Sequence, residues 1–235
     1  GILALLGVAI IIKLVGISKP GLSILRPYLS FGVPLTLNSL SSKILHLGDR
    51  YVIALFLGAS AVGVYAVAYA LGDLVLMLLS PITLALLRPL SKSYDEGNKQ
   101  QVKTYLNYSL RYFLLFAIPA VVGISLLSTT AVRSLTTKEF VEDVFIITSL
   151  VSLANIAYGL YIISSRTLLL VKKTRLLAGL LFSFAVFNIF LNLLLVPSIG
   201  TVGAALSTLV CYVSLLLITL FFSKKSGIQL YIEKL

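Results

Sequence analysis

Lys43, His46 and Arg50 could together bind an anion, because these three ionisable side chains lie in a stretch that is otherwise mostly apolar. Lys43 and Arg50 are seven residues apart, so on a helix they point the same way, with His46 about 60° away. They predict a basic stripe about 10 Å long that could bind a phosphate group or an acidic sugar. Ionisable side chains are costly in lipid, and therefore indicate a functional site.

Asp73 is the acid that we expect beside this stripe. A tight glycine turn at residues 58–60 would place Lys43 and Asp73 at matching depths, each about 22 Å from the turn. We therefore predict that the two charges come within reach of each other. Either they simply neutralise each other, or they form a gate or an element that binds a cation, Na+ or H+. Asp49 is expected on a different face, near the outer end of its helix.

Other polar side chains leave two interpretations each. Tyr65 and Tyr69 are four residues apart on the side of Asp73, and could stack on sugar or anchor the membrane interface. Arg166 could line a substrate cleft or extend its long side chain toward the cytoplasmic interface. His46 could act as a proton switch or pack as a neutral ring.

Amide side chains within apolar segments should face protein rather than lipid, and hydrogen bonds between helices are their expected role. These residues are Asn38, Asn155, Asn188 and Asn192. The chain has one His and one Cys, Cys211, so we expect no transition-metal site and no internal disulfide.

The composition indicates an all-α, polytopic membrane protein, since 59% of the 235 residues are hydrophobic and 11% are charged. The net charge of +11 does not indicate nucleic-acid binding, because the cations lie in short clusters between apolar segments. By the positive-inside rule, the connections that contain more Lys and Arg are expected on the cytoplasmic side, and the C-terminus is expected there with them. Their cations are Lys13, Lys19 and Arg26; Arg88, Lys92, Lys99 and Lys103; Lys172, Lys173 and Arg175; Lys224, Lys225 and Lys234.

About seven transmembrane helices are predicted from the apolar segments. Residues 1–18 would be the end of a preceding helix, 19–27 a cytoplasmic connection, and 223–235 a cytoplasmic tail. A six-helix bundle would occupy residues 28–222, with helices at about 28–57, 61–87, 105–127, 144–171, 176–196 and 201–222.

Several motifs, taken in order, resemble the polysaccharide flippase family of the multidrug/oligosaccharidyl-lipid/polysaccharide (MOP) exporter superfamily. In the first half they are residues 26–40 (RPYLSFGVPLTLNSL), 48–53 (GDRYVI) and 56–65 (FLGASAVGVY). In the second half they are residues 169–174 (LLVKKT), the pair Asn188 and Asn192, and residues 196–205 (VPSIGTVGAA).

This resemblance implies two lobes of helices around a cleft that opens alternately to the two sides of the membrane. The chain resembles the second lobe, so its implied partners are a missing N-terminal lobe, membrane lipids and a lipid-linked oligosaccharide. The function implied is that of a flippase for polysaccharide precursors in the cytoplasmic membrane. Lys43, His46, Arg50, Tyr65, Tyr69 and Arg166 are the candidates for lining the cleft.

Three alternatives remain open. A drug or metabolite exporter of the same superfamily would share the fold, although a basic cleft favours an anionic glycan. A membrane-embedded glycosyltransferase or polymerase would need acids at an aqueous loop, and Glu139, Glu142 and Asp143 form the one such cluster. That loop is small for a catalytic domain, so we do not expect an enzyme. The chain could also be a half-transporter that pairs with a separate chain.

Overall fold

The computed structural model describes residues 22–135 and 143–225, which form α-helices joined by short turns and contain no β-strand. The all-α prediction is confirmed. The helices are α2 (Leu22–Met77), α3 (Leu79–Asp95), α4 (Lys99–Leu135), α5 (Val144–Leu170) and α6 (Thr174–Lys225). The predicted helix end at 1–18, Glu139, Glu142 and residues 226–235 of the predicted tail lie outside the described residues.

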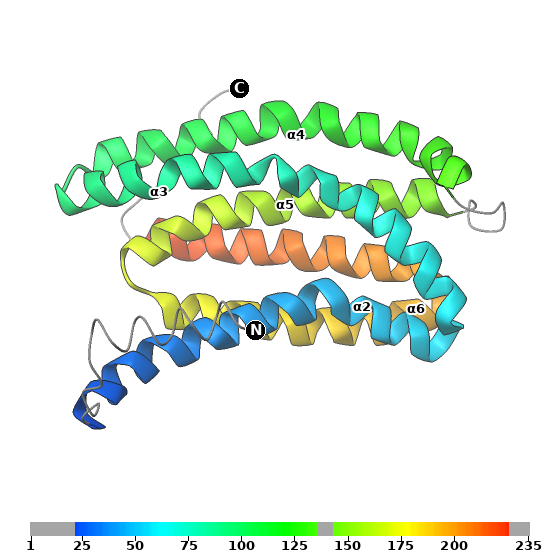
Figure 1. Cartoon of the computed structure of the whole chain (residues 1–235), viewed down its shortest axis with the longest axis horizontal. Helices are drawn as coiled ribbons and strands as arrows, with labels where there is room; N and C mark the ends of the chain where they lie inside the picture. Colours follow the sequence, from blue (N-terminus) through cyan, green and yellow to red (C-terminus); the bar gives the residue numbers. More distant parts are fainter. Residues whose placement is uncertain (1–21, 136–142, 226–235) are drawn as a thin grey trace, which may run out of the picture.

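Two of these helices fold back on themselves, and each makes a hairpin of two antiparallel arms (Figure 1). α2 bends at Gly58, where φ is 81° and ψ is 176°. α6 bends at Ile199 and Gly200, and Gly200 has φ 64° and ψ −147°. A positive φ favours glycine, which has no Cβ to clash with the backbone. The bend in α2 thus falls where the sequence predicts a tight glycine turn.

The predicted count of about seven helices is not matched, because the described residues contain four helical segments long and apolar enough to span a membrane. These segments are Thr36–Asp95, Lys99–Arg133, Val144–Leu170 and Thr174–Lys225. Two of the three missing helices are accounted for by the bends at Gly58 and Gly200, which leave helical backbone on both sides with no intervening loop. The third, predicted at 1–18, lies outside the described residues. A hydropathy pattern reads two segments where the structure has one bent helix. The chain is a multi-pass membrane protein.

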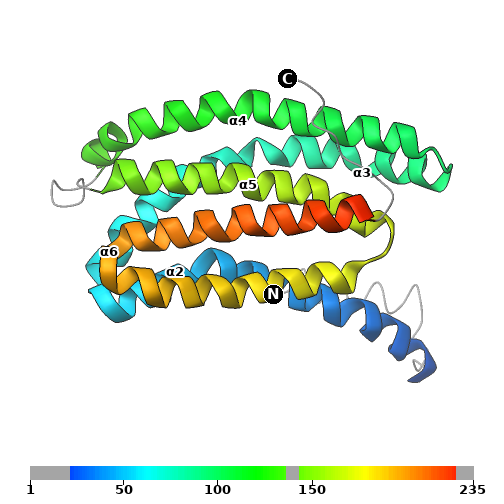
Figure 2. The same cartoon turned by 180° about the vertical axis from the view of Figure 1, so that it is seen from behind.

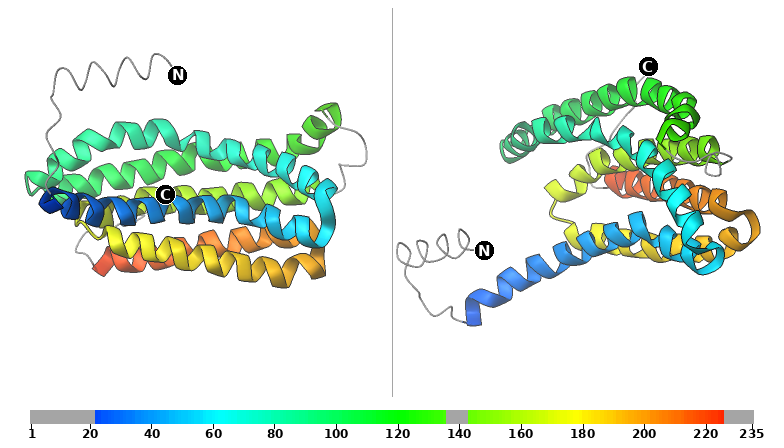
Figure 3. Two further views of the ribbon diagram at one scale, coloured as in Figure 1. Left: turned by 60° about the horizontal axis from the view of Figure 1, so that its bottom comes forward. Right: turned by 45° about the vertical axis from the view of Figure 1, so that its right-hand side comes forward.

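α5 is the centre of the bundle. In its most apolar stretch of 18 residues 61% is buried, whereas the corresponding stretch of the segment that contains α2 is 22% buried. In Figures 1 and 2, α5 lies between α4 and the second arm of α6, residues 201–225. The first arms of α2 and α6, residues 22–57 and 174–198, lie together at the opposite edge from α4 (Figure 3). Buried apolar side chains of α2, α5 and α6 form the core at the centre of the two hairpins.

Replacement of Gly203 by Ala is expected to destabilise the α6 hairpin. A Cβ at this position would lie 2.6 Å from the Leu195 carbonyl oxygen and 2.7 Å from its carbon, and backbone atoms cannot rotate away. We expect a loss of about 1–3 kcal/mol in the free energy of unfolding, the usual cost of overpacking. Thermal unfolding in detergent measures it, with Gly179→Ala as the control because nothing lies within 4 Å of a Cβ there. Equal unfolding of the two variants would contradict the close approach.

Candidate functional site

Asp49, in the first arm of α2, is fully buried and accepts three hydrogen bonds. The Tyr65 hydroxyl and the Thr208 hydroxyl each donate to Oδ2 at 2.7 Å, and the Asn192 amide donates to Oδ1 at 2.8 Å. Tyr65 belongs to the second arm of α2, Asn192 to the first arm of α6, and Thr208 to its second arm. One carboxyl group therefore joins all four arms of the two hairpins.

The polar network continues from Asn192 to Asn188, one turn earlier on α6. The Asn192 amide also donates to the Asn188 carbonyl oxygen at 2.9 Å and to its side-chain oxygen at 3.2 Å. Asn192 Oδ1 and Asn188 Nδ2 are buried without a hydrogen-bond partner in the part of the chain that the structure describes. Because Asn155 is also fully buried, three of the four predicted amides face protein, as expected.

His46 lies within a group of tyrosines next to this network. Its Nδ1 is 3.3 Å from the hydroxyls of Tyr69 and Tyr212. The ring of Tyr158 meets the imidazole edge-on at 5.0 Å between centroids, and Tyr158 stacks on Tyr212 at 4.7 Å. The imidazole is therefore enclosed by aromatic side chains from the second arm of α2, from α5 and from α6.

Arg50 and Asp73 complete a charged group on the α2 hairpin. The Arg50 guanidinium lies 5.8 Å from the Tyr69 ring centroid, a cation–π distance. Half-buried Asp73 accepts a hydrogen bond from Asn155 Nδ2 at 2.9 Å, and the same amide donates to the Gly72 carbonyl at 3.1 Å. Asp73 interacts electrostatically with both His46 and Arg50. We call His46, Arg50 and Asp73 the hairpin charge cluster.

A family model for polysaccharide biosynthesis proteins matches residues 2–145, more than half of the chain. The chain belongs to this family. The match contains the whole α2 hairpin with Asp49 and the hairpin charge cluster. The resemblance drawn from the motifs is therefore confirmed.

Two curated proteins of Haloferax volcanii are similar to this member of the family. The probable low-salt glycan biosynthesis flippase Agl15 is 24% identical over 82% of this chain and 40% of its own length. The probable flippase AglR is 26% identical over 68% of this chain and 34% of its own length. The chain thus spans less than half the length of these relatives. No solved structure matches.

The structure brings four predicted cleft candidates of this family member together and leaves two apart. His46, Arg50, Tyr65 and Tyr69 adjoin one another on the α2 hairpin. The rings of Tyr65 and Tyr69 are buried, however, so in this structure they contact protein rather than a surface where sugar could stack.

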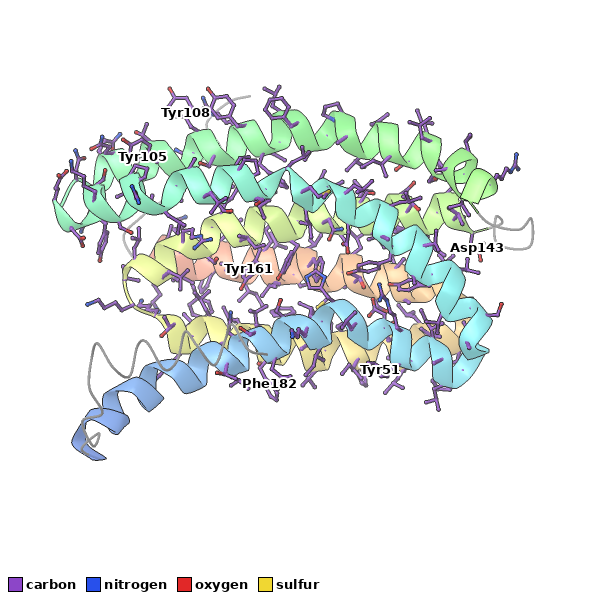
Figure 4. All side chains as sticks on the ribbon, viewed as in Figure 1. Tyr51, Tyr105, Tyr108, Asp143, Tyr161 and Phe182 are labelled. Carbon is purple, nitrogen blue, oxygen red and sulfur yellow. The ribbon has the colours of Figure 1, made fainter. Side chains whose placement is uncertain are left out.

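Lys43 lies apart from the hairpin charge cluster. Its side chain is exposed and lines a hollow of about 430 Å³ with Leu47, Tyr51 and Ile189. Figure 4 shows Tyr51 on the outer side of the first arm. No ion pair within 4.0 Å joins Lys43 to Asp73, both of which belong to the described residues, so the predicted pairing is not present in this structure.

Arg166 lies apart as well, between α3 and α5. It is half-buried and lines a pocket of about 160 Å³ together with the hydroxyl residues Thr83 and Ser91. This position lies apart from the hairpin charge cluster, and both predictions for Arg166, a place in the cleft or a side chain that reaches toward the cytoplasmic interface, stay open. Arg166 thus remains a separate candidate.

Asp49 was not among the site candidates that the helical spacing of charged residues suggested. The sequence predicts only that it lies on a different face near the outer end of its helix, and does not predict the three donors that surround it in the structure. Tyr158, Tyr212 and Thr208 were also missed. One signal was available, because an acid within an apolar run needs donors, and the Asn188–Asn192 pair with Thr208 supplies polar groups on the last hairpin.

Proposed function

We propose that the complete protein carrying this chain moves a lipid-linked oligosaccharide across the cytoplasmic membrane, with this chain forming one of two lobes. The observation that carries the proposal is the hairpin charge cluster on α2, in a chain that belongs to a polysaccharide biosynthesis family. The two Haloferax relatives, both described as probable flippases, support it, and the chain covers 40% and 34% of their lengths. The remainder would supply the other lobe.

The chemistry of the substrate explains why such a cluster is useful. A lipid-linked oligosaccharide carries phosphate and polar sugar, and both must be shielded from lipid during crossing. Arg50 offers a cation held against Tyr69, and its Nε is buried with no hydrogen-bond partner among the described residues. A guanidinium can bind two phosphate oxygens at once. The α2 hairpin would face the other lobe, and alternating access would expose the cluster first to the cytoplasm and then to the outside.

Coupling to a cation, Na+ or H+, is proposed at Asp73. One of its oxygens accepts the Asn155 amide, and its other partners are the charges of His46 and Arg50 rather than Lys43. A carboxylate in this setting could bind a cation while it still interacts electrostatically with Arg50. The orientation proposed for the chain has a cytoplasmic C-terminus, as the basic connections indicate.

Flipping by the complete protein in proteoliposomes tests the function and the coupling. A lipid-linked oligosaccharide in the inner leaflet should become accessible to a glycosidase added outside when the protein is present, and not in empty vesicles. An imposed Na+ or proton gradient should accelerate flipping, and Asp73→Asn should reduce that acceleration by about 5–150-fold, because coupling energies are typically about 1–3 kcal/mol. Lys43→Leu is the comparison, since Lys43 lies apart from the cluster.

Two results would contradict these proposals separately. Transport of a cationic drug without transport of the lipid-linked oligosaccharide would identify an exporter of another substrate class. Full flipping and an unchanged gradient response in the Lys43→Leu, Asp73→Leu double variant would remove the coupling role while leaving the flippase function intact.

A further inference from the structure

Arg166 is a half-buried cation on α5, the most buried of the membrane segments, and no acid of the described residues neutralises it. The acids at the end of α3 are Asp95 and Glu96. Glu96 is 3.8 Å from the amine of Lys92, and Asp95 forms no ion pair within 4.0 Å in the described part of the chain. Arg166 also makes no hydrogen bond to another described residue. Because a charge in a membrane helix is costly without a partner, this guanidinium is suited to an anion from outside the chain.

A pocket of about 160 Å³ between α3 and α5 contains Arg166 and two hydroxyl residues of α3, Thr83 and Ser91. The Thr83 hydroxyl already donates to the Ser80 carbonyl oxygen at 2.9 Å. The Ser91 hydroxyl makes no hydrogen bond to another described residue and can donate to a ligand. The guanidinium and the Ser91 hydroxyl are therefore the donors that this pocket offers, and both suit an anionic oxygen.

Leucine side chains make up the rest of the pocket lining. Leu87 of α3 is 49% exposed and Leu169 of α5 is 38% exposed, so both are accessible from outside the bundle. Leu90 of α3 is buried. The pocket thus combines donors for an anion with apolar side chains that a hydrocarbon chain can cover.

The pocket lies near one end of the bundle. Figures 1 and 2 show the connection from α3 to α4 and the connection from α5 to α6 at the same end. Arg166 is six residues before Lys172, about 9 Å along the helix, and Ser91 is four residues before Asp95, about 6 Å. The polar headgroup region of a bilayer is roughly 5–8 Å thick on each side, and an arginine side chain is long enough to reach it. The pocket is therefore at the level of lipid phosphate groups.

We propose that this pocket binds the phosphate group of one anionic phospholipid from the adjacent leaflet. The Arg166 guanidinium binds two of the phosphate oxygens, and the Ser91 hydroxyl donates to another. The acyl chains lie along Leu87 and Leu169. The volume of the pocket accommodates a phosphate group but not an oligosaccharide, and inorganic phosphate would leave the exposed leucines uncovered. The site lies on α3 and α5, apart from the hairpin charge cluster of α2.

Native mass spectrometry of the purified complete protein in detergent tests this site. Phosphatidylglycerol and phosphatidylcholine with the same acyl chains are titrated separately, and the wild type should prefer phosphatidylglycerol. Arg166→Gln should raise the dissociation constant for phosphatidylglycerol by on the order of 10–100-fold and abolish the preference. Arg175→Gln is the matched control, because it removes the same charge from an exposed position at the start of α6, outside the pocket.

Two conservative variants and an unfolding measurement separate binding from a structural role. Arg166→Lys keeps the charge but loses the planar fork, so it should bind phosphatidylglycerol with intermediate affinity. Ser91→Ala should weaken binding by about fivefold, as expected for one neutral hydrogen bond. Without lipid, Arg166→Gln should unfold at the wild-type temperature, because Arg166 has no partner among the described residues. Added phosphatidylglycerol should raise that temperature for the wild type and for Arg175→Gln, but not for Arg166→Gln.

Three results would overturn the proposal. The first is equal affinity for phosphatidylglycerol in Arg166→Gln and Arg175→Gln. The second is full competition by inorganic phosphate, which would make the pocket a site for free anions. The third is weaker binding of the lipid-linked oligosaccharide in Arg166→Gln with phosphatidylglycerol binding unchanged, which would assign Arg166 to the transported molecule.

Discussion

Replacing Asp49 by Ala is expected to lower the free energy of unfolding by about 3–5 kcal/mol, because three buried donors lose their acceptor. The Tyr65 and Thr208 hydroxyls and the Asn192 amide all donate to this carboxyl group at 2.7–2.8 Å, and each belongs to a different helical arm. Unsatisfied donors of this kind cost about 1–3 kcal/mol each when buried. The loss should therefore loosen the contact between the α2 and α6 hairpins.

Chemical or thermal unfolding of the purified protein measures this change. Asp95→Ala is the matched control, because Asp95 is exposed at the end of α3 and should unfold like the wild type. Thr208→Val removes one donor and should cost about 1 kcal/mol. Combined with Asp49→Ala, it should cost less than the sum, since both changes break the same bond. Equal stability of Asp49→Ala and Asp95→Ala would show that the network contributes nothing.

The surroundings of Asp49 could not be predicted from the sequence, although the helical spacing around it could. The helical spacing of Lys43, His46 and Arg50 is local, and of these three residues the structure places His46 and Arg50 in the hairpin charge cluster. The partners of Asp49 are remote, however, with Asn192 143 residues and Thr208 159 residues further along the chain. Which residues of α6 meet Asp49 depends on how the two hairpins pack, and no local spacing specifies that.

For the fold, the class and one turn could be predicted from the sequence, but the number of helices could not. Composition alone gave an all-helical membrane protein, and glycine at residue 58 indicated a turn that the structure has, with φ at 81°. The count of helices was not matched, in part because the bends at Gly58 and Gly200 do not interrupt the helical backbone as loops would, and in part because the predicted helix at 1–18 lies outside the described residues. The placement of Lys43 also depended on packing. Equal depth along two antiparallel arms does not ensure that two side chains face each other, and Lys43 faces an outer hollow.

Arg50→Gln is expected to reduce flipping by the complete protein by about 10–100-fold, with the stability changed by less than about 1 kcal/mol. The guanidinium is half-buried, lies over Tyr69 and interacts with Asp73, so its position is held by the α2 hairpin before any substrate arrives. Charge-assisted hydrogen bonds to phosphate contribute about 1.5–3 kcal/mol, which corresponds to that range of rates. The measurement is the initial rate of oligosaccharide accessibility in proteoliposomes.

Two further variants separate the charge of Arg50 from its shape. Arg50→Lys keeps the charge but loses the planar fork that binds two oxygens, so it should recover part of the rate. Lys172→Gln removes a cation from the exposed connection before α6 and should flip like the wild type. If binding of the oligosaccharide is the step affected, the loss in Arg50→Gln should be greatest at low substrate and diminish at saturation. A wild-type rate for Arg50→Gln, or a loss equal to that of Lys172→Gln, would mean that the cluster on α2 holds the hairpin together without contacting substrate.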